Sequence, residues 1–259
     1  MDVRFRFAIL GAGRLGEAIA RTWLARTGDV PLLWSRSGPR SSGHAKQRIA
    51  DARWVRDWTS LLEAESIAIA VPGKALLELA QGNEQAARFS GNVFCAASAL
   101  SCKSLQRVFP RATIVCISPF LIDGVNSIPM LVLRPRDLPL PQWVKAKAEL
   151  ENLGDFDVVA DEQTFAHLAL LGASWPVVVS AAVQAAASAG VKRLPDETAT
   201  RIARRIFFRG VQSLLTSGGN DVATPGGITE RGLKSLGEVN NLFDAVFQQM
   251  QARARELRA

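Results

Sequence analysis

Short apolar runs alternate with amphipathic segments through residues 1–160. The apolar runs have the length of buried strands and lie at residues 4–10, 30–34, 66–71, 92–96, 113–117, 130–133 and 156–159. Between them, apolar residues at helical spacing predict helices at residues 15–26, 45–50, 58–63, 74–87, 103–108 and 141–153. This alternation predicts an α/β domain with a mainly parallel sheet and helices on both faces.

The pattern changes after residue 160, where strand signals end and only helical periodicity remains. Helices are predicted at residues 162–189, 196–217, 229–236 and 241–258. The first is rich in alanine, whose small side chain lets two helices pack closely. We therefore predict an α/β domain at residues 1–160, followed by an all-α dimerisation and substrate domain at residues 161–259. The expected assembly is a homodimer or a higher homo-oligomer.

A glycine-rich loop joins the first predicted strand to the first predicted helix. It reads Gly11-Ala12-Gly13-Arg14-Leu15-Gly16. The spacing is typical of a Rossmann dinucleotide site, in which the first glycine makes a tight turn and the second admits the pyrophosphate. The third glycine lets the helix pack on the strand, and the helix N-terminus attracts the phosphates. We expect all six residues to bind the cofactor.

The end of the second predicted strand indicates which dinucleotide is bound. A site for NAD usually has Asp or Glu here, which holds the ribose 2′-hydroxyl. This chain has Ser35-Arg36-Ser37 instead, with Arg40 close by. Serine hydroxyls and a guanidinium hydrogen-bond a 2′-phosphate, which a carboxylate would repel. The sequence therefore predicts NADPH as the cofactor.

The composition narrows the partners and the setting. The 259 residues carry a formal net charge of +7, but the basic residues are scattered along the chain, so we expect no nucleic-acid partner. No apolar run reaches the length of about 18 residues typical of a transmembrane helix, so we expect no membrane partner. The three cysteines show no CxxC spacing, and their odd number argues against a disulfide framework. We expect a cytoplasmic protein.

The residue types that are rare or missing restrict the chemistry. The chain has no tyrosine, which excludes a Tyr-Lys dehydrogenase mechanism, and only two histidines. His44 lies in a Gly/Ser loop, and His167 lies in an apolar helix, where a core role is expected. No His, Cys or carboxylate cluster has metal-ligand spacing, so we expect no metal. Reduction of a protonated imine needs little acid–base apparatus and suits these constraints.

A second glycine turn lies far along the chain. The segment Thr224-Pro225-Gly226-Gly227-Ile228-Thr229 leads into a predicted helix. Successive backbone N–H groups at such a turn can form an anion-binding nest. The same residues can also be an ordinary capped helix start, with Thr229 as the cap.

Three segments together resemble the pyrroline-5-carboxylate reductase family. TPGGITERGLKSL is similar to the family's C-terminal signature, AILGAGRLGEAIA to its opening, and LLGASWPVVVSAAVQAAASAGVKRLP to its dimerisation helix. The resemblance spans nearly the whole chain in order. It implies a Rossmann domain with a helical dimerisation domain. The implied activity is NADPH-dependent reduction of a cyclic imine, either 1-pyrroline-5-carboxylate to proline or a close analogue.

The resemblance also implies roles for individual residues. Thr229 would hydrogen-bond the substrate and is the candidate catalytic side chain. The expected substrate-binding residues are Gly226, Gly227, Ile228, Ser174 and Trp175. Further cofactor contacts are expected from Ala70, Val71, Pro72, Ala96, Ala97 and Ser98. In this family the substrate site forms between the subunits of a dimer.

Three departures from the family pattern leave the substrate open. Val71-Pro72-Gly73-Lys74 shifts a lysine, Ile117-Ser118-Pro119-Phe120 replaces a Met-Pro-Asn-Thr-Pro stretch, and Trp175 replaces a glycine. Two alternatives therefore stand beside the imine reductase. One is a related NADP oxidoreductase of the F420-dependent type, and the other is an NADPH-binding regulatory protein without catalysis.

Overall fold

The computed structural model describes residues 5–36, 38, 52–97, 100–120, 127–190, 197–205 and 236–256. By its internal contacts the chain divides into two compact units, with the division between Ala169 and Leu170. The predicted helix at residues 45–50 lies outside the described residues, as does the predicted helix at residues 229–236 except for its last residue.

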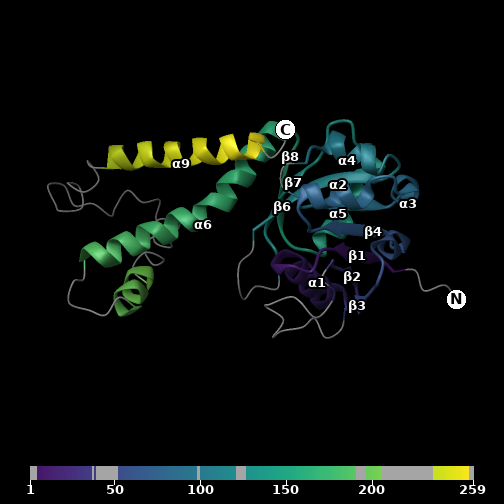
Figure 1. The fold of residues 1–259 in the computed structure, drawn as a ribbon, viewed down its shortest axis with the longest axis horizontal. Coiled ribbons are helices and arrows are strands. Elements are labelled where there is room, and N and C mark those ends of the chain that lie inside the picture. The colour runs from purple at the N-terminus through teal and green to yellow at the C-terminus, as the bar shows by residue number, and fades with distance from the viewer. Residues whose placement is uncertain are drawn as a thin grey trace. The chain divides into compact units, whose positions relative to one another are not determined.

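The first unit is built on one eight-stranded sheet (Figure 1). In chain order its strands are β1 (Phe7–Leu10), β2 (Leu32–Trp34), β3 (Arg53–Trp54), β4 (Ser66–Ile69), β5 (Asn92–Cys95), β6 (Thr113–Pro119), β7 (Met130–Leu133) and β8 (Phe156–Val159). Their order across the sheet is β3-β2-β1-β4-β5-β6-β7-β8. All neighbours are parallel except β6 and β7. The predicted α/β class with a mainly parallel sheet is confirmed.

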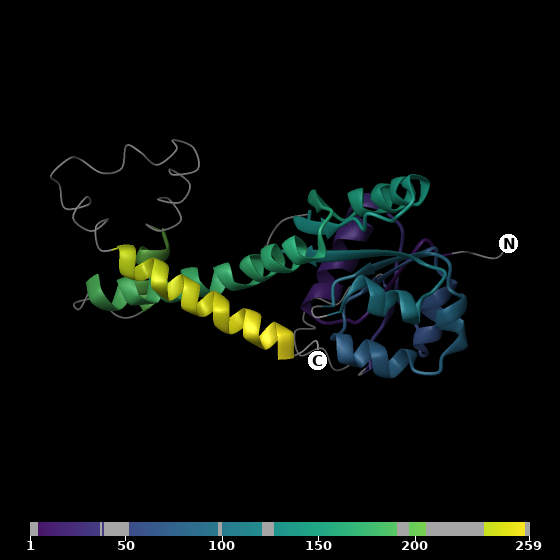
Figure 2. The same ribbon diagram turned by 90° about the horizontal axis from the view of Figure 1, so that it is seen from above.

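Helices cover both faces of this sheet, which is why its strands are apolar on both sides (Figure 2). α1 (Arg14–Thr27) and α5 (Leu140–Glu151) cover the face that carries Phe7 and Ile9. The opposite face, with Ala8 and Leu10, is covered by the 3-10 helix η2 (Trp58–Glu63) and by α2 (Gly73–Ala80), α3 (Glu84–Arg88) and α4 (Cys102–Val108).

Two features of this unit differ from the sequence prediction. The single helix expected at residues 74–87 is two helices, α2 and α3. Gly82 adopts a left-handed φ of 70° between them, and the Asn83 side chain caps α3 by accepting N–H bonds from Gln85 and Ala86 at 3.0 and 3.1 Å. The two-residue strand β3 was not predicted, because it is too short to show a period.

The second unit is helical in its described part. It contains most of α6 (Glu162–Gly190), a helix at residues 197–205, and α9 (Leu236–Glu256). At the start of α6, the Asp161 carboxylate accepts the Thr164 N–H at 2.6 Å. The predicted all-α character of the C-terminal domain is confirmed. None of the described helices is long and apolar enough to cross a membrane.

Glu149 on α5 is buried in the first unit, and hydrogen bonds do not fully replace the water that its carboxyl group has lost. Its Oε2 atom is buried and has no hydrogen-bond partner. Burial raises the pKa of this carboxyl group above its ordinary value, while Arg6 and a hydrogen bond from Ser66 oppose the shift. The folded chain therefore holds this proton more tightly than the unfolded chain does. The tighter proton binding contributes to the free energy of unfolding. This contribution is fully present below the ordinary carboxyl pKa and is lost as the pH rises through the raised pKa of the folded state.

Glu149→Gln removes the charge while keeping the shape. At about pH 7 we expect the thermal midpoint to rise by roughly 2–4 °C, because a buried carboxylate no longer has to be desolvated. At about pH 4 the variant and the parent should differ less, because most of the carboxyl groups are then protonated in both the folded and the unfolded chain. Thermal denaturation followed by circular dichroism at both pH values measures this. The control Glu151→Gln, at an exposed ion pair with Lys147, should shift the midpoint only slightly. An unchanged or lower midpoint for Glu149→Gln at pH 7 would contradict the assignment.

Candidate functional site

Four of the predicted cofactor segments follow directly on strands that end at one edge of the sheet. Leu10 of β1 is in register with Trp34 of β2 and with Ile69 of β4, and Ile69 is in register with Cys95 of β5. The ladder continues one residue further, since Gly11 donates to the Trp34 carbonyl at 2.8 Å. The segments that begin at Gly11, Ser35, Ala70 and Ala96 therefore lie together at the carboxyl edge of the parallel strands, where α/β folds bind ligands.

The packing of the chain itself requires two of the three loop glycines. Gly11 has a φ of 113°, and a Cβ there would lie 2.7 Å from the Ala70 carbonyl oxygen and 2.8 Å from Val71 Cγ1. A Cβ on Gly16 would overlap the Gly11 carbonyl oxygen. These contacts hold the start of α1 against the end of β1, as expected for the first and third glycines of the loop.

Gly13 is different, because no contact within the chain requires it to be glycine. Its φ is −77°, and a Cβ there would meet no atom within 4 Å. It is the N-cap of α1 and has no side chain with which to cap the first turn. The first-turn N–H groups of α1, which include those of Arg14 and Leu15, therefore receive no side-chain cap from Gly13, and the space beside Gly13 is open. Such a cradle fits the pyrophosphate of a dinucleotide.

The predicted 2′-phosphate segment forms a turn at the end of β2. The Gly38 N–H donates to the Ser35 carbonyl at 3.0 Å, and the Ser35 hydroxyl lies 3.4 Å from the Gly38 carbonyl. The Arg36 side chain is 69% exposed, and its Nη2 lies 3.5 Å from Oε2 of Glu78 on α2. Ser37, Arg40 and His44 lie outside the described residues.

Glu78 is therefore a residue that sequence reasoning missed. The sequence predicts NADPH because no carboxylate follows β2, yet the fold brings one there from α2. No local pattern around Glu78 signals this, because 42 residues separate it from Arg36. The ion pair is exposed and long, so it holds Arg36 only weakly.

The remaining cofactor segments form the middle of the edge. Ala70, Val71 and Pro72 connect β4 to α2, and Ala97 follows β5. Gly73 lets this region pack against the β5–α4 connection, because a Cβ on Gly73 would lie 2.8 Å from Leu100 Cγ. Ser98 lies outside the described residues.

The segment that departs from the family pattern after the sixth strand continues β6 into an antiparallel pair with β7. Ser118 pairs with Leu131 and Pro119 with Met130, and the Phe120 N–H donates to the Pro129 carbonyl at 2.8 Å. This departure therefore belongs to a strand pair and not to a free loop.

The structure describes little of the predicted substrate region. Ser174 and Trp175 lie within α6, but their side chains are outside the described part, as are Gly226, Gly227, Ile228 and Thr229 entirely. His167 also lies on α6 and is half-buried, not a core residue as expected, because α6 is only partly covered there. The roles of the substrate residues stay predictions.

Comparison with known proteins identifies the helical part. Residues 162–257 match the family described as pyrroline-5-carboxylate reductase dimerisation, and the resemblance found in the sequence is confirmed. By sequence, no curated protein matches the chain.

Solved structures share the fold over almost the whole chain. A pyrroline-5-carboxylate reductase from Coxiella burnetii is 18% identical, covers 99% of both chains and has a TM-score of 0.79. Plasmodium falciparum pyrroline carboxylate reductase with NADP bound is 15% identical, covers 98% of this chain and 97% of its own, and has a TM-score of 0.76. A Streptomyces aurantiacus imine reductase is 18% identical, with 97% of this chain and 93% of its own chain covered, and has a TM-score of 0.59.

Two of the loop glycines, Gly13 and Gly16, give a test that separates ligand contact from folding. Gly13→Ala should weaken dinucleotide binding about tenfold or more, because the methyl group enters the ligand's space. It should lower the thermal midpoint by only a few degrees, the ordinary cost of alanine at a helix N-cap. Gly16→Ala should lower the thermal midpoint itself, because the methyl group overlaps backbone. Fluorescence titration with NADPH and thermal denaturation measure the two effects. A Gly13→Ala variant that binds NADPH like the parent would contradict the assignment of the cradle.

Proposed function

We propose that this chain is an NADPH-dependent reductase of a cyclic C=N bond, because residues 162–257 match the pyrroline-5-carboxylate reductase dimerisation family. The proposed substrate is 1-pyrroline-5-carboxylate, which is reduced to proline, or a close cyclic analogue. This match carries the proposal. It is supported by the Rossmann unit, where the space beside Gly13 at the start of α1 is open for a ligand. The proposed assembly is a homodimer.

At the carboxyl edge of the sheet, different residues are proposed to bind different parts of the dinucleotide. The first turn of α1 offers its N–H groups to the pyrophosphate, with no side-chain methyl at Gly13 in the way. Arg36 offers a guanidinium to the 2′-phosphate, for which it must exchange its weak pairing with Glu78. Ala70, Val71 and Ala97 are the small apolar residues proposed beside the ribose and nicotinamide. When bound, NADPH supplies a hydride to the electrophilic carbon of the imine.

The proposed substrate site is formed by the second glycine turn and by α6. We propose that the backbone N–H groups of Gly226, Gly227 and Ile228 bind the substrate carboxylate, and that Thr229 hydrogen-bonds the ring nitrogen or the carboxylate. Ser174 and Trp175 would line the same pocket, and the indole of Trp175 would restrict the size of the ring that is accepted. The imine nitrogen keeps its own proton, so no histidine is needed.

A substrate panel tests the proposal. Purified full-length protein is assayed with NADPH and with 1-pyrroline-5-carboxylate, other cyclic imines and oxidised F420 in separate reactions. Turnover with a cyclic imine above a no-enzyme control supports the proposal. Turnover with F420 alone would replace it by the related oxidoreductase, and tight NADPH binding without any turnover would replace it by a regulatory protein.

Two opposite substitutions test the 2′-phosphate position. Arg36→Asp should raise the KM for NADPH at least tenfold, because it removes a cation and adds a repelling charge. Glu78→Gln should tighten NADPH binding roughly two- to fivefold, because it frees Arg36 and removes a nearby carboxylate. Affinity for NADH should change little in Glu78→Gln, since NADH has no 2′-phosphate.

The matched control is Glu84→Gln, which breaks an exposed pair with Arg88 on α3. It should leave the affinity for both dinucleotides unchanged. Unaltered NADPH kinetics in Arg36→Asp would contradict the cofactor assignment, and equal effects of Glu78→Gln on NADPH and NADH would contradict the role of Glu78.

Thr229→Ala tests the catalytic assignment. We expect turnover to fall about tenfold or more, because a hydrogen bond to the reacting ring is lost, while the Kd for NADPH stays the same. Steady-state kinetics and a fluorescence titration separate the two quantities. Unchanged turnover would mean that Thr229 only caps its helix.

A further inference from the structure

The three cysteines, which lie apart in sequence, gather on one face of the sheet. Cys95 of β5 and Cys116 of β6 are register partners, so their side chains point to the same side. Cys102 is the first residue of α4, which packs on that side, and all three contribute to the same core cluster. The Cys102 and Cys116 sulfur atoms lie 3.1 Å apart, within hydrogen-bond distance.

The three thiols have different environments. Cys95 is 2% exposed, and burial raises its pKa to about 12. Cys116 is also buried, and its contact with Cys102, together with burial, raises its pKa well above the ordinary value. The pKa of Cys102 is lowered, chiefly by the hydrogen bond with Cys116, although burial and the carboxylates of Glu162 and Asp137 oppose the shift. Cys102 is thus the thiol most ready to ionise.

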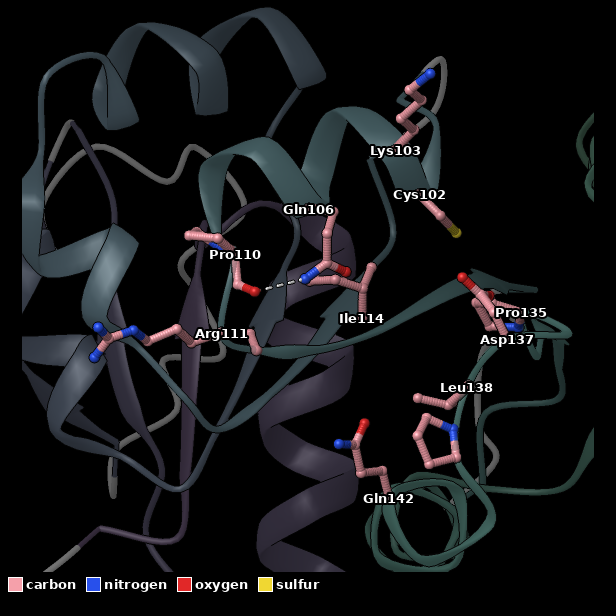
Figure 3. A pocket seen from close by; sticks show the side chains of 12 residues that line it. Cys102, Lys103, Gln106, Pro110, Arg111, Ile114, Pro135, Asp137, Leu138 and Gln142 are labelled. Carbon is pink, nitrogen blue, oxygen red and sulfur yellow. Dashed lines mark hydrogen bonds between the residues drawn. The ribbon is translucent and has the colours of Figure 1, made fainter.

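Cys102 is also the one that a small solute can reach. It is half-buried and lines a cavity of about 510 Å³ between α4 and the connection from β7 to α5. Figure 3 shows its sulfur at this cavity, together with Lys103, Gln106 and Asp137. Cys116 lies behind Cys102, where it can reach the Cys102 sulfur but is shielded from solvent.

We propose that Cys102 and Cys116 form a peroxide-reactive dithiol, in which Cys102 is the attacking thiol and Cys116 the resolving thiol. This site goes beyond the reductase activity proposed above and does not depend on it. The small-molecule partner is hydrogen peroxide.

The chemistry balances in two steps. The Cys102 thiolate attacks one peroxide oxygen, the O–O bond breaks, and the departing hydroxide takes a proton to leave as water, with a sulfenic acid on Cys102. The Cys116 sulfur then attacks the Cys102 sulfur, the S–O bond breaks, and a second water leaves with the Cys116 proton. Two thiols lose two electrons to form one disulfide, and one peroxide is reduced to two waters.

The disulfide would join the start of α4 to the middle of β6. The sulfur atoms must close from 3.1 Å to about 2.05 Å, so the first turn of α4 has to shift. That turn is also held by Glu162 at the start of α6, whose carboxylate accepts the Cys102 N–H at 3.2 Å. Oxidation would therefore act where the β5–α4 connection meets the first turn of α6.

Thiol counting on the full-length protein tests the site. After treatment with hydrogen peroxide, quenching and unfolding, the free thiols should fall from three to one, and peptide mass spectrometry should find a Cys102–Cys116 link that dithiothreitol reverses. Cys95→Ser should still lose two thiols, whereas Cys102→Ser and Cys116→Ser should form no intramolecular disulfide. A link that includes Cys95, a link between chains, sulfinic acid on Cys102 without a disulfide, or three unreacted thiols would each overturn the proposal.

A second readout tests whether the contact tunes Cys102. The rate of Cys102 alkylation by iodoacetamide is measured against pH in the parent and in Cys116→Ala, with circular dichroism to confirm that the variant is folded. Loss of the Cys116 hydrogen bond should move the pH midpoint upward and slow alkylation several-fold at neutral pH. An identical pH profile in the variant would show that Cys116 does not lower the pKa of Cys102, which would overturn the assignment of Cys102 as the activated attacking thiol.

Discussion

The carboxyl edge of the sheet depends on the close approach of two backbone segments, the end of β1 and the start of α1. Gly16 lies so near the Gly11 carbonyl oxygen that no side chain fits between them, and Gly11 itself needs a positive φ. This contact sets the direction in which α1 leaves the sheet. Because β1 lies between β2 and β4, it also sets which other segments meet the first turn of α1.

At this edge some residues are needed for packing, and others are available for a ligand. Gly11 and Gly16 are needed for packing, whereas Gly13 has free space around it and no conformational need to be glycine. As the N-cap of α1, Gly13 suits the helix start, and its open surroundings also suit the proposed pyrophosphate contact. The Arg36–Glu78 pair is of the same kind, since it contributes little to stability at an exposed position but places a cation beside the segment after β4.

The features predicted from sequence are those fixed by local physics. The strand periods, the glycine loop and the alanine-rich α6 are each determined by neighbouring residues, and seven of the eight strands were predicted at nearly their observed positions. The break between α2 and α3 lies at Gln81-Gly82-Asn83, where a polar run with a glycine interrupts the apolar period, so the turn is signalled locally although a single helix was predicted there. Glu78 and the Cys102–Cys116 contact could not be predicted, because each joins residues that only the sheet order brings together. The substrate residues from Gly226 to Thr229 have support from the sequence resemblance alone.

We propose that a hydride passes from NADPH to the carbon of a cyclic imine on this chain. NADPH labelled with deuterium at nicotinamide C4 tests it directly, in single turnover with 1-pyrroline-5-carboxylate and its cyclic analogues. We expect that label on one face of C4 leads to one deuterium on the product carbon next to nitrogen, and that label on the opposite face does not. Product without deuterium from either labelled form, or no product with any cyclic imine, would contradict it.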